Sequence, residues 1–109
     1  MDIDLDRIPS TYLQDYHPEV GDSFKAMRQA IAKGPLDYET CEYIVIASFA
    51  QAGFEEPLKI HVTRMLNRGT PVANLKHAVE VTLGATTPLF AVVRALRWID
   101  EAVAEHGTP

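Results

Sequence analysis

The sequence predicts an all-α protein, a bundle of about five helices built around a central antiparallel helix hairpin. Apolar residues recur at helical spacing along the chain, and alternation of period two never persists over the length of a strand. Proline and glycine punctuate this pattern at intervals that suit helices. With 109 residues, the chain is expected to form a single domain, 1–109.

Residues 1–20 are expected to form an N-terminal arm that is mostly irregular, because Pro18 disfavours helix at His17. The first helix is then expected to begin near Asp22 or Ser23 and to end at Gly34. Three apolar residues recur in it at helical spacing, Phe24, Met27 and Ile31.

The second predicted helix has Asp37 as its N-cap and ends at Gly53. Its middle, YIVIASFA, is apolar all round. A helix of this kind is buried on every side, so we expect it at the centre of the core or of a subunit interface.

Three further helices are predicted to begin at prolines, which are tolerated at the first helical position. They are expected to run from about Pro57 to Arg68, from Pro71 to Leu83 and from Pro88 to Glu105. Thr70 and Thr87 are the expected caps of the last two.

The charge pattern argues against several classes of protein. Fifteen acidic and ten basic residues give a net charge of −5, and the basic residues form no run, so no nucleic-acid partner is expected. The acidic first twenty residues do not resemble a secretory signal, and no apolar run is long enough to span a membrane. Cys41 is the only cysteine, which favours the cytoplasm.

His61 is the residue most suggestive of chemistry. It lies three residues after Leu58, on the stripe that also carries Val62 and Met65, and is therefore predicted to point inward. An inward histidine needs a hydrogen-bond partner, and Glu42 is the acidic residue next to the most apolar stretch. The two lie at different heights along adjacent helices, so a direct contact requires an axial offset, a crossing angle or a partner subunit.

The segment GPLDYETCEYIVIASFAQAGFEEPLKIHVTRMLNRGTP resembles the core of the carboxymuconolactone decarboxylase and AhpD-like family, and GATTPLFAVVRALRWIDEA resembles that family's last helix. Redox members have a glutamate, then a C-x-x-C pair, then a histidine one helical turn later. On this chain the glutamate matches Glu42 and the histidine matches His61, while Phe54 and Pro57 occupy the two cysteine positions.

This departure implies that the chain is not a peroxidase, because neither Phe nor Pro can attack or resolve a disulfide. The family's decarboxylase branch also lacks the pair. The resemblance therefore implies a cofactor-free acid–base catalyst of a small carboxylate or lactone, with His61 as the acid and Glu42 as its partner. Arg64 is the candidate for gripping the substrate carboxylate. Arg68 and Arg94 are weaker candidates for that grip.

Each candidate has a structural alternative. His61 can be a satisfied core histidine, Glu42 a helix-dipole or salt-bridge residue, and Arg64 a solvated or interface arginine. A non-enzymatic ligand-binding or assembly domain on the same scaffold is the competing hypothesis.

No metal or other cofactor is expected, because the sequence has neither clustered ligands nor a glycine-rich phosphate loop. A homo-oligomer is expected, because some apolar residues lie off the inward stripes and need a neighbour to cover them, among them Ala30, Ile31, Ile44, Ala47 and Ile60. The family resemblance implies a trimer or hexamer.

Overall fold

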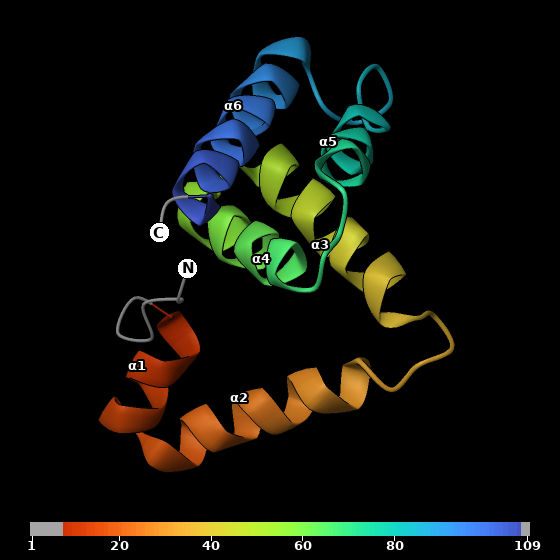
Figure 1. Ribbon diagram of the computed structural model, residues 1–109. Helices are drawn as coiled ribbons and strands as arrows, with labels where there is room; N and C mark the ends of the chain where they lie inside the picture. The colour runs from red at the N-terminus through yellow and green to blue at the C-terminus, as the bar shows by residue number, and fades with distance from the viewer. Residues whose placement is uncertain (1–7, 108–109) are drawn as a thin grey trace. The chain divides into compact units, whose positions relative to one another are not determined.

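The computed structural model describes residues 8–107 of the chain. This part contains six α-helices and no β-strand, which confirms the all-α prediction and corrects the expected number of about five (Figure 1). The helices are α1 (Pro9–Tyr16), α2 (Pro18–Ile31), α3 (Tyr38–Ala52), α4 (Glu55–Asn67), α5 (Val72–Glu80) and α6 (Leu89–His106).

The prediction of a mostly irregular arm over residues 1–20 is wrong where those residues are described, and residues 1–7 lie outside the described part. Pro9 and Pro18 each open a helix at its first turn, where the missing N–H has no intrahelical partner to lose. Between Pro9 and Val20, only His17 leaves the helical conformation, with φ −144° and ψ 85°. The effect of Pro18 on the preceding residue is therefore confined to a one-residue break between two helices.

The described residues divide into two compact units, 8–41 and 42–107, and α3 crosses the boundary near its beginning. In the first unit, α1 and α2 pack as a hairpin with Gly21 at the crossing. A Cβ atom at Gly21 would lie 2.5 Å from the Cα of Gln14, so only glycine allows this approach. Gln14 Nε2 also donates a hydrogen bond of 2.8 Å to Asp22 Oδ1 beside the crossing.

Helices α3 to α6 begin and end close to the expected residues. Asp37 caps α3, because its Oδ1 accepts a 2.8 Å hydrogen bond from the backbone N–H of Thr40. Hydrogen bonding from Thr40 lowers the pKa of the Asp37 carboxyl. Gly53 ends the α3 region at φ +81°, in the left-handed conformation that suits a helix end.

The expected caps Thr70 and Thr87 are corrected by the structure. Pro71 and Pro88, in extended conformation, occupy the N-cap positions of α5 and α6, and neither helix has a side-chain cap. The two threonines precede these caps, and their buried hydroxyl oxygens have no hydrogen-bond partner. α5 and α6 therefore begin one residue later than expected, at Val72 and Leu89.

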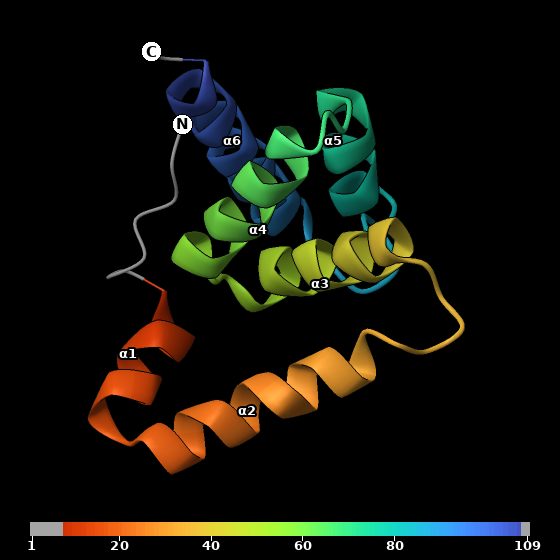
Figure 2. The ribbon, with the colours of Figure 1, turned by 60° about the horizontal axis from the view of Figure 1, so that its bottom comes forward.

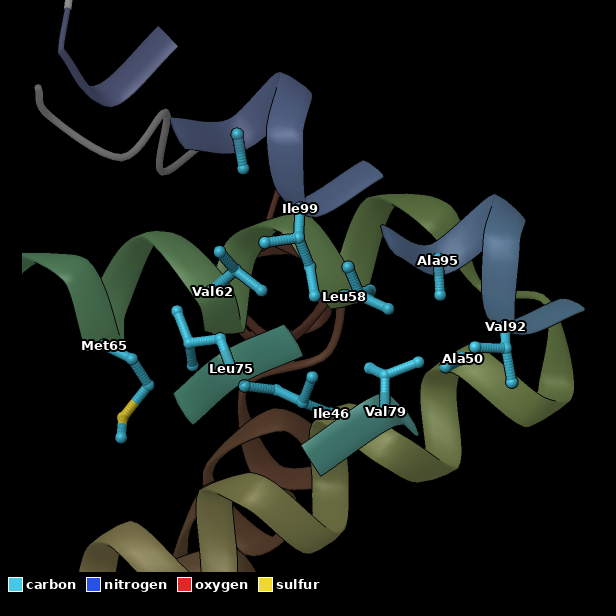
Figure 3. Packing of buried hydrophobic residues seen from close by; sticks show 11 residues of the cluster. Ile46, Ala50, Leu58, Val62, Met65, Leu75, Val79, Val92, Ala95 and Ile99 are labelled. Carbon is cyan, nitrogen blue, oxygen red and sulfur yellow. The ribbon is translucent and has the colours of Figure 1, made fainter. Parts of the chain in front are cut away.

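The core of the second unit is built from one stripe of each of its four helices (Figure 3). α3 contributes Ile46 and Ala50, and α6 approaches from the opposite side of the cluster. Between them lie the stripes of α4 and α5. The fully buried large side chains are Ile46, Leu58, Val62, Met65, Leu75, Val79 and Ile99. Burying side chains of this size is the main favourable term in folding of the unit.

The structure also corrects the expectation that α3 is buried on every side. Only Glu42, Ile46 and Ala50 are buried, which places one stripe of the helix in the core. Ile44, on another face, is half exposed. No helix in the described part of the chain combines the length and apolar character that a membrane crossing requires.

Candidate active site

Glu42 and His61 are positioned by two helices that meet at the Gly53 turn. Glu42 is the first member of the buried α3 stripe, one turn before Ile46. His61 lies between the buried residues Leu58 and Met65 of α4. α4 returns in the opposite sense to α3 after the turn (Figure 2). Both side chains are therefore directed into the space between the two helices.

The two side chains form a hydrogen bond of 2.7 Å between His61 Nδ1 and Glu42 Oε2. The His61 side chain is only 17% exposed and the Glu42 side chain only 10%. The imidazole also packs against the ring of Phe49, with 5.2 Å between ring centroids and a tilt of 55°. Phe49 lies two turns after Glu42 on α3, so one face of this helix supplies both neighbours of the imidazole.

The sequence left open whether Glu42 and His61 of the same chain can touch, and the structure shows that they do. The bond joins residues that are 19 positions apart, with no residue from another subunit involved. The contact between α3 and α4 at this point is made by the two side chains and not by the helix backbones. Phe49 was missed as a neighbour of His61, although its spacing from Glu42 places the two on the same face of α3.

The arrangement fixes which imidazole nitrogen is available for chemistry. With Glu42 ionised, Nδ1 carries a hydrogen and donates it to Oε2, which leaves Nε2 as the nitrogen that can take up and release a proton. A carboxylate on Nδ1 also stabilises the imidazolium formed when Nε2 is protonated. The pair can thus act as an oriented general acid or base.

The three arginines predicted to bind a substrate carboxylate lie in different surroundings. Arg64 is half-buried in the last turn of α4, one turn after His61, and has no ion pair with any described residue. Arg68 is exposed at the C-cap of α4. No hydrogen bond or ion pair between described residues joins Arg64 or Arg94 to the Glu42–His61 pair.

Arg94 is held by its neighbours on α6. Its guanidinium carbon lies 5.7 Å from the ring centroid of Phe90 and 5.1 Å from that of Trp98, within cation–π range. A Cβ on Gly53 would lie 2.8 Å from an Nη atom of Arg94, so the guanidinium lies against the α3–α4 turn. Its Nε is buried without a hydrogen-bond partner. These contacts indicate a packing role for Arg94.

A groove between α3 and α5 was not foreseen from the sequence. It has a volume of about 680 Å³, and its apolar walls include Ile44 and Ala47 on α3, Ala78 on α5 and Val81 at the C-cap of α5. We call it the α3–α5 groove. Neither Glu42 nor His61 lines it. The small side chains at Ala47 and Ala78 were the available signal, because they leave space between facing helices.

The described residues offer no cluster of three His, Cys, Asp or Glu side chains that could hold a metal ion. Cys41, the only cysteine of the chain, is half-buried, and its Sγ donates a weak hydrogen bond to the Leu36 carbonyl over 3.7 Å. The Leu36 carbonyl is thus the hydrogen-bond partner of this thiol.

Comparison of the chain with protein-family models, with curated proteins and with solved structures finds no match in any of the three.

Proposed function

We propose that this protein is a cofactor-free acid–base catalyst that acts on a small carboxylate or lactone in the cytoplasm. The observation that carries the proposal is the hydrogen bond between His61 Nδ1 and Glu42 Oε2, made by two largely buried side chains. A carboxylate–imidazole pair of this geometry orients the ring and leaves Nε2 for proton transfer. The resemblance to the carboxymuconolactone decarboxylase and AhpD-like family supplies the reaction class.

In the proposed reaction, the bond between the substrate's ring carbon and its carboxylate breaks and carbon dioxide leaves. The electron pair of that bond remains on the ring carbon, conjugated with a carbonyl group. Protonated His61 then donates the Nε2 proton to this carbon and becomes neutral, while Glu42 keeps Nδ1 hydrogen-bonded throughout. Uptake of a proton from water restores the imidazolium.

Arg64 is proposed to bind the substrate carboxylate, because it follows His61 by one helical turn and is half-buried. Peroxidase activity is not proposed, because Phe54 and Pro57 stand where redox members of the family have cysteines.

The test is turnover of a carboxylated γ-lactone in D2O, followed by carbon dioxide release and by deuterium at the carbon that lost the carboxylate. His61→Ala should reduce the rate by at least about 100-fold, the usual minimum contribution of a general acid. His17→Ala is the matched control, since His17 is exposed and lies between α1 and α2. His17→Ala should leave the rate unchanged, and turnover that survives His61→Ala would refute the assignment.

One observation favours the alternative of a non-enzymatic ligand-binding or assembly domain. The α3–α5 groove is lined by residues other than the pair, and the His61 ring packs against Phe49. Under this alternative, wild-type protein shows no turnover, and His61→Ala leaves ligand binding and assembly unchanged. The same deuterium experiment therefore separates the two functions.

A further inference from the structure

The hydrogen bond to Glu42 does not fix the imidazole ring of His61 completely. It holds Nδ1 at 2.7 Å from Glu42 Oε2. Rotation about the bond that joins the ring to the rest of the side chain is soft, because torsions to planar groups have broad minima. A hydrogen bond also tolerates a moderate tilt of its donor. The direction in which Nε2 is presented therefore depends on a second contact of the ring.

Phe49 makes this second contact. Its ring centroid lies 5.2 Å from that of the imidazole, with 55° between the two planes. This separation is typical of favourable aromatic pairs, and the tilt avoids the face-to-face stack that such pairs disfavour. Phe49 follows Glu42 by seven residues on α3, which is about 10.5 Å along the helix axis. α3 thus contacts the imidazole at two separate points, once through a hydrogen bond and once through a ring.

Phe49 is itself fixed to the turn that begins α4. Its backbone carbonyl accepts hydrogen bonds from the N–H of Gly53, at 2.9 Å, and of Phe54, at 3.0 Å. Its ring packs against the ring of Phe54, the N-cap residue of α4, with 6.3 Å between centroids. The Phe49 ring is also partly buried against the hydrophobic core. Because α4 carries His61, Phe49 and the imidazole belong to one local framework, which lies entirely within residues 42–107.

The chemistry of phenylalanine suits this position. Its side chain has no hydrogen-bond donor or acceptor, so it can orient the imidazole without competing for either ring nitrogen. An aliphatic side chain of similar size fills the same space, but it offers no flat surface against which the plane of an imidazole can rest. The aromatic ring, rather than apolar volume alone, is therefore the feature that constrains His61.

We propose that Phe49 is a positioning residue for His61, which fixes the plane of the imidazole so that Nε2 is presented to a substrate in one direction. Phe49 acts through His61 and takes no part in binding the substrate or in proton transfer. The consequence for catalysis rests on the proposed function, whereas the fixed ring plane rests only on the contacts among Glu42, Phe49 and His61. Separate measurements test these two parts.

Three substitutions in the full chain test the proposal. Phe49→Leu removes the aromatic ring and keeps most of the apolar volume. Phe49→Tyr keeps the ring and serves as the rescue variant. Phe90→Leu is the matched control, because it makes the same chemical change at a ring that contacts Arg94 on α6. Circular dichroism and the midpoint of urea unfolding establish that each variant is folded.

The first measurement is the mobility of the His61 ring, obtained from ¹³C relaxation of protein labelled in its histidine rings. His61→Ala identifies the His61 signals by their loss. In the wild type the ring should be ordered and should show nuclear Overhauser effects to the Phe49 ring. Phe49→Leu should lower the order parameter of the His61 ring, whereas Phe49→Tyr and Phe90→Leu should keep the wild-type value. This measurement needs no substrate.

The second measurement is turnover of the carboxylated γ-lactone. Phe49→Leu should lower kcat by about 10-fold to 100-fold, because displacing a reacting group by about 1 Å can cost about 100-fold in rate. KM should stay within about two-fold of wild type, since the substituted side chain does not touch the substrate. Phe49→Tyr should recover most of kcat, and Phe90→Leu should retain it.

Three results would overturn the proposal. The first is a wild-type imidazole that is mobile or shows no nuclear Overhauser effect to the Phe49 ring, a result that does not depend on whether Phe49→Leu folds. The second is an unchanged order parameter of the His61 ring in folded Phe49→Leu. The third is an active wild type in which Phe49→Leu raises KM and keeps kcat, which would place Phe49 in substrate binding. A wild type without turnover refutes the proposed function alone, and the ring measurement then decides the proposal.

Discussion

His61 Nδ1 lies 2.7 Å from Glu42 Oε2, and this hydrogen bond ties the middle of α4 to the beginning of α3. Both partners are largely removed from solvent, so neither can exchange the other for water without structural change. The bond therefore has consequences for stability as well as for chemistry.

A double-mutant cycle on Glu42→Ala and His61→Ala should give a coupling energy of about 1.5–3 kcal/mol. This is the usual range for hydrogen bonds that involve a charged group. The free energies of unfolding are obtained from urea titrations at neutral pH. Additivity of the two single variants within about 0.5 kcal/mol would mean that the bond contributes nothing to stability.

Leu58→Ala should lower the free energy of unfolding by about 2–5 kcal/mol, because it opens a cavity at a fully buried position of the core. Leu89→Ala makes the same chemical change at a leucine that is mostly exposed and should stay within about 0.5 kcal/mol of wild type. Thermal and urea unfolding followed by circular dichroism measure both. Equal losses would show that Leu58 is not in the core.

Gly53→Ala and Gly69→Ala should each destabilise the protein by about 1–2 kcal/mol, because both glycines have positive φ. They differ in their surroundings. A Cβ at Gly53 meets the guanidinium of Arg94, whereas nothing lies within 4 Å of one at Gly69. Because Arg94 packs on Trp98, the only tryptophan, Gly53→Ala alone should change the fluorescence emission. An identical spectrum in both variants would contradict this placement of Arg94.

Gly21→Ala should open the α1–α2 hairpin. In an ordinary helix interior this change is favourable by up to about 1 kcal/mol, but here the new Cβ meets the backbone of Gln14. Amide hydrogen exchange around Gln14 should accelerate. Gly34→Ala is the control, because its Cβ would meet only the Ile31 carbonyl, at 3.5 Å. Unchanged exchange in Gly21→Ala would show that the crossing is looser than described.

Much of the fold could be predicted because the residues that begin and end its helices act locally. Asp37, Gly53, Pro71 and Pro88 mark the ends of α3, α5 and α6 within a few residues. The helices of the first twenty residues were missed, although Pro18 opens α2 at its first position, as Pro71 was expected to do for the helix that follows it. The effect of proline on its preceding residue was extended to a whole segment, whereas it affects only His17.

The site was predictable to the extent that it depends on helix faces. The stripe of Leu58 and Met65 placed His61 inward, and the need for a partner selected Glu42. The contact itself depends on how α3 and α4 diverge from their turn, which no periodicity encodes. The position of Arg94 against Gly53 depends on tertiary packing in the same way.

The most direct test of the central claim is a long-range ¹⁵N–¹H correlation spectrum of the His61 imidazole at neutral and at high pH. If Glu42 holds Nδ1 and leaves Nε2 for proton transfer, the neutral imidazole carries its hydrogen on Nδ1, and Glu42→Ala removes this preference. A neutral His61 that carries its hydrogen on Nε2, with a bare Nδ1, would contradict the account.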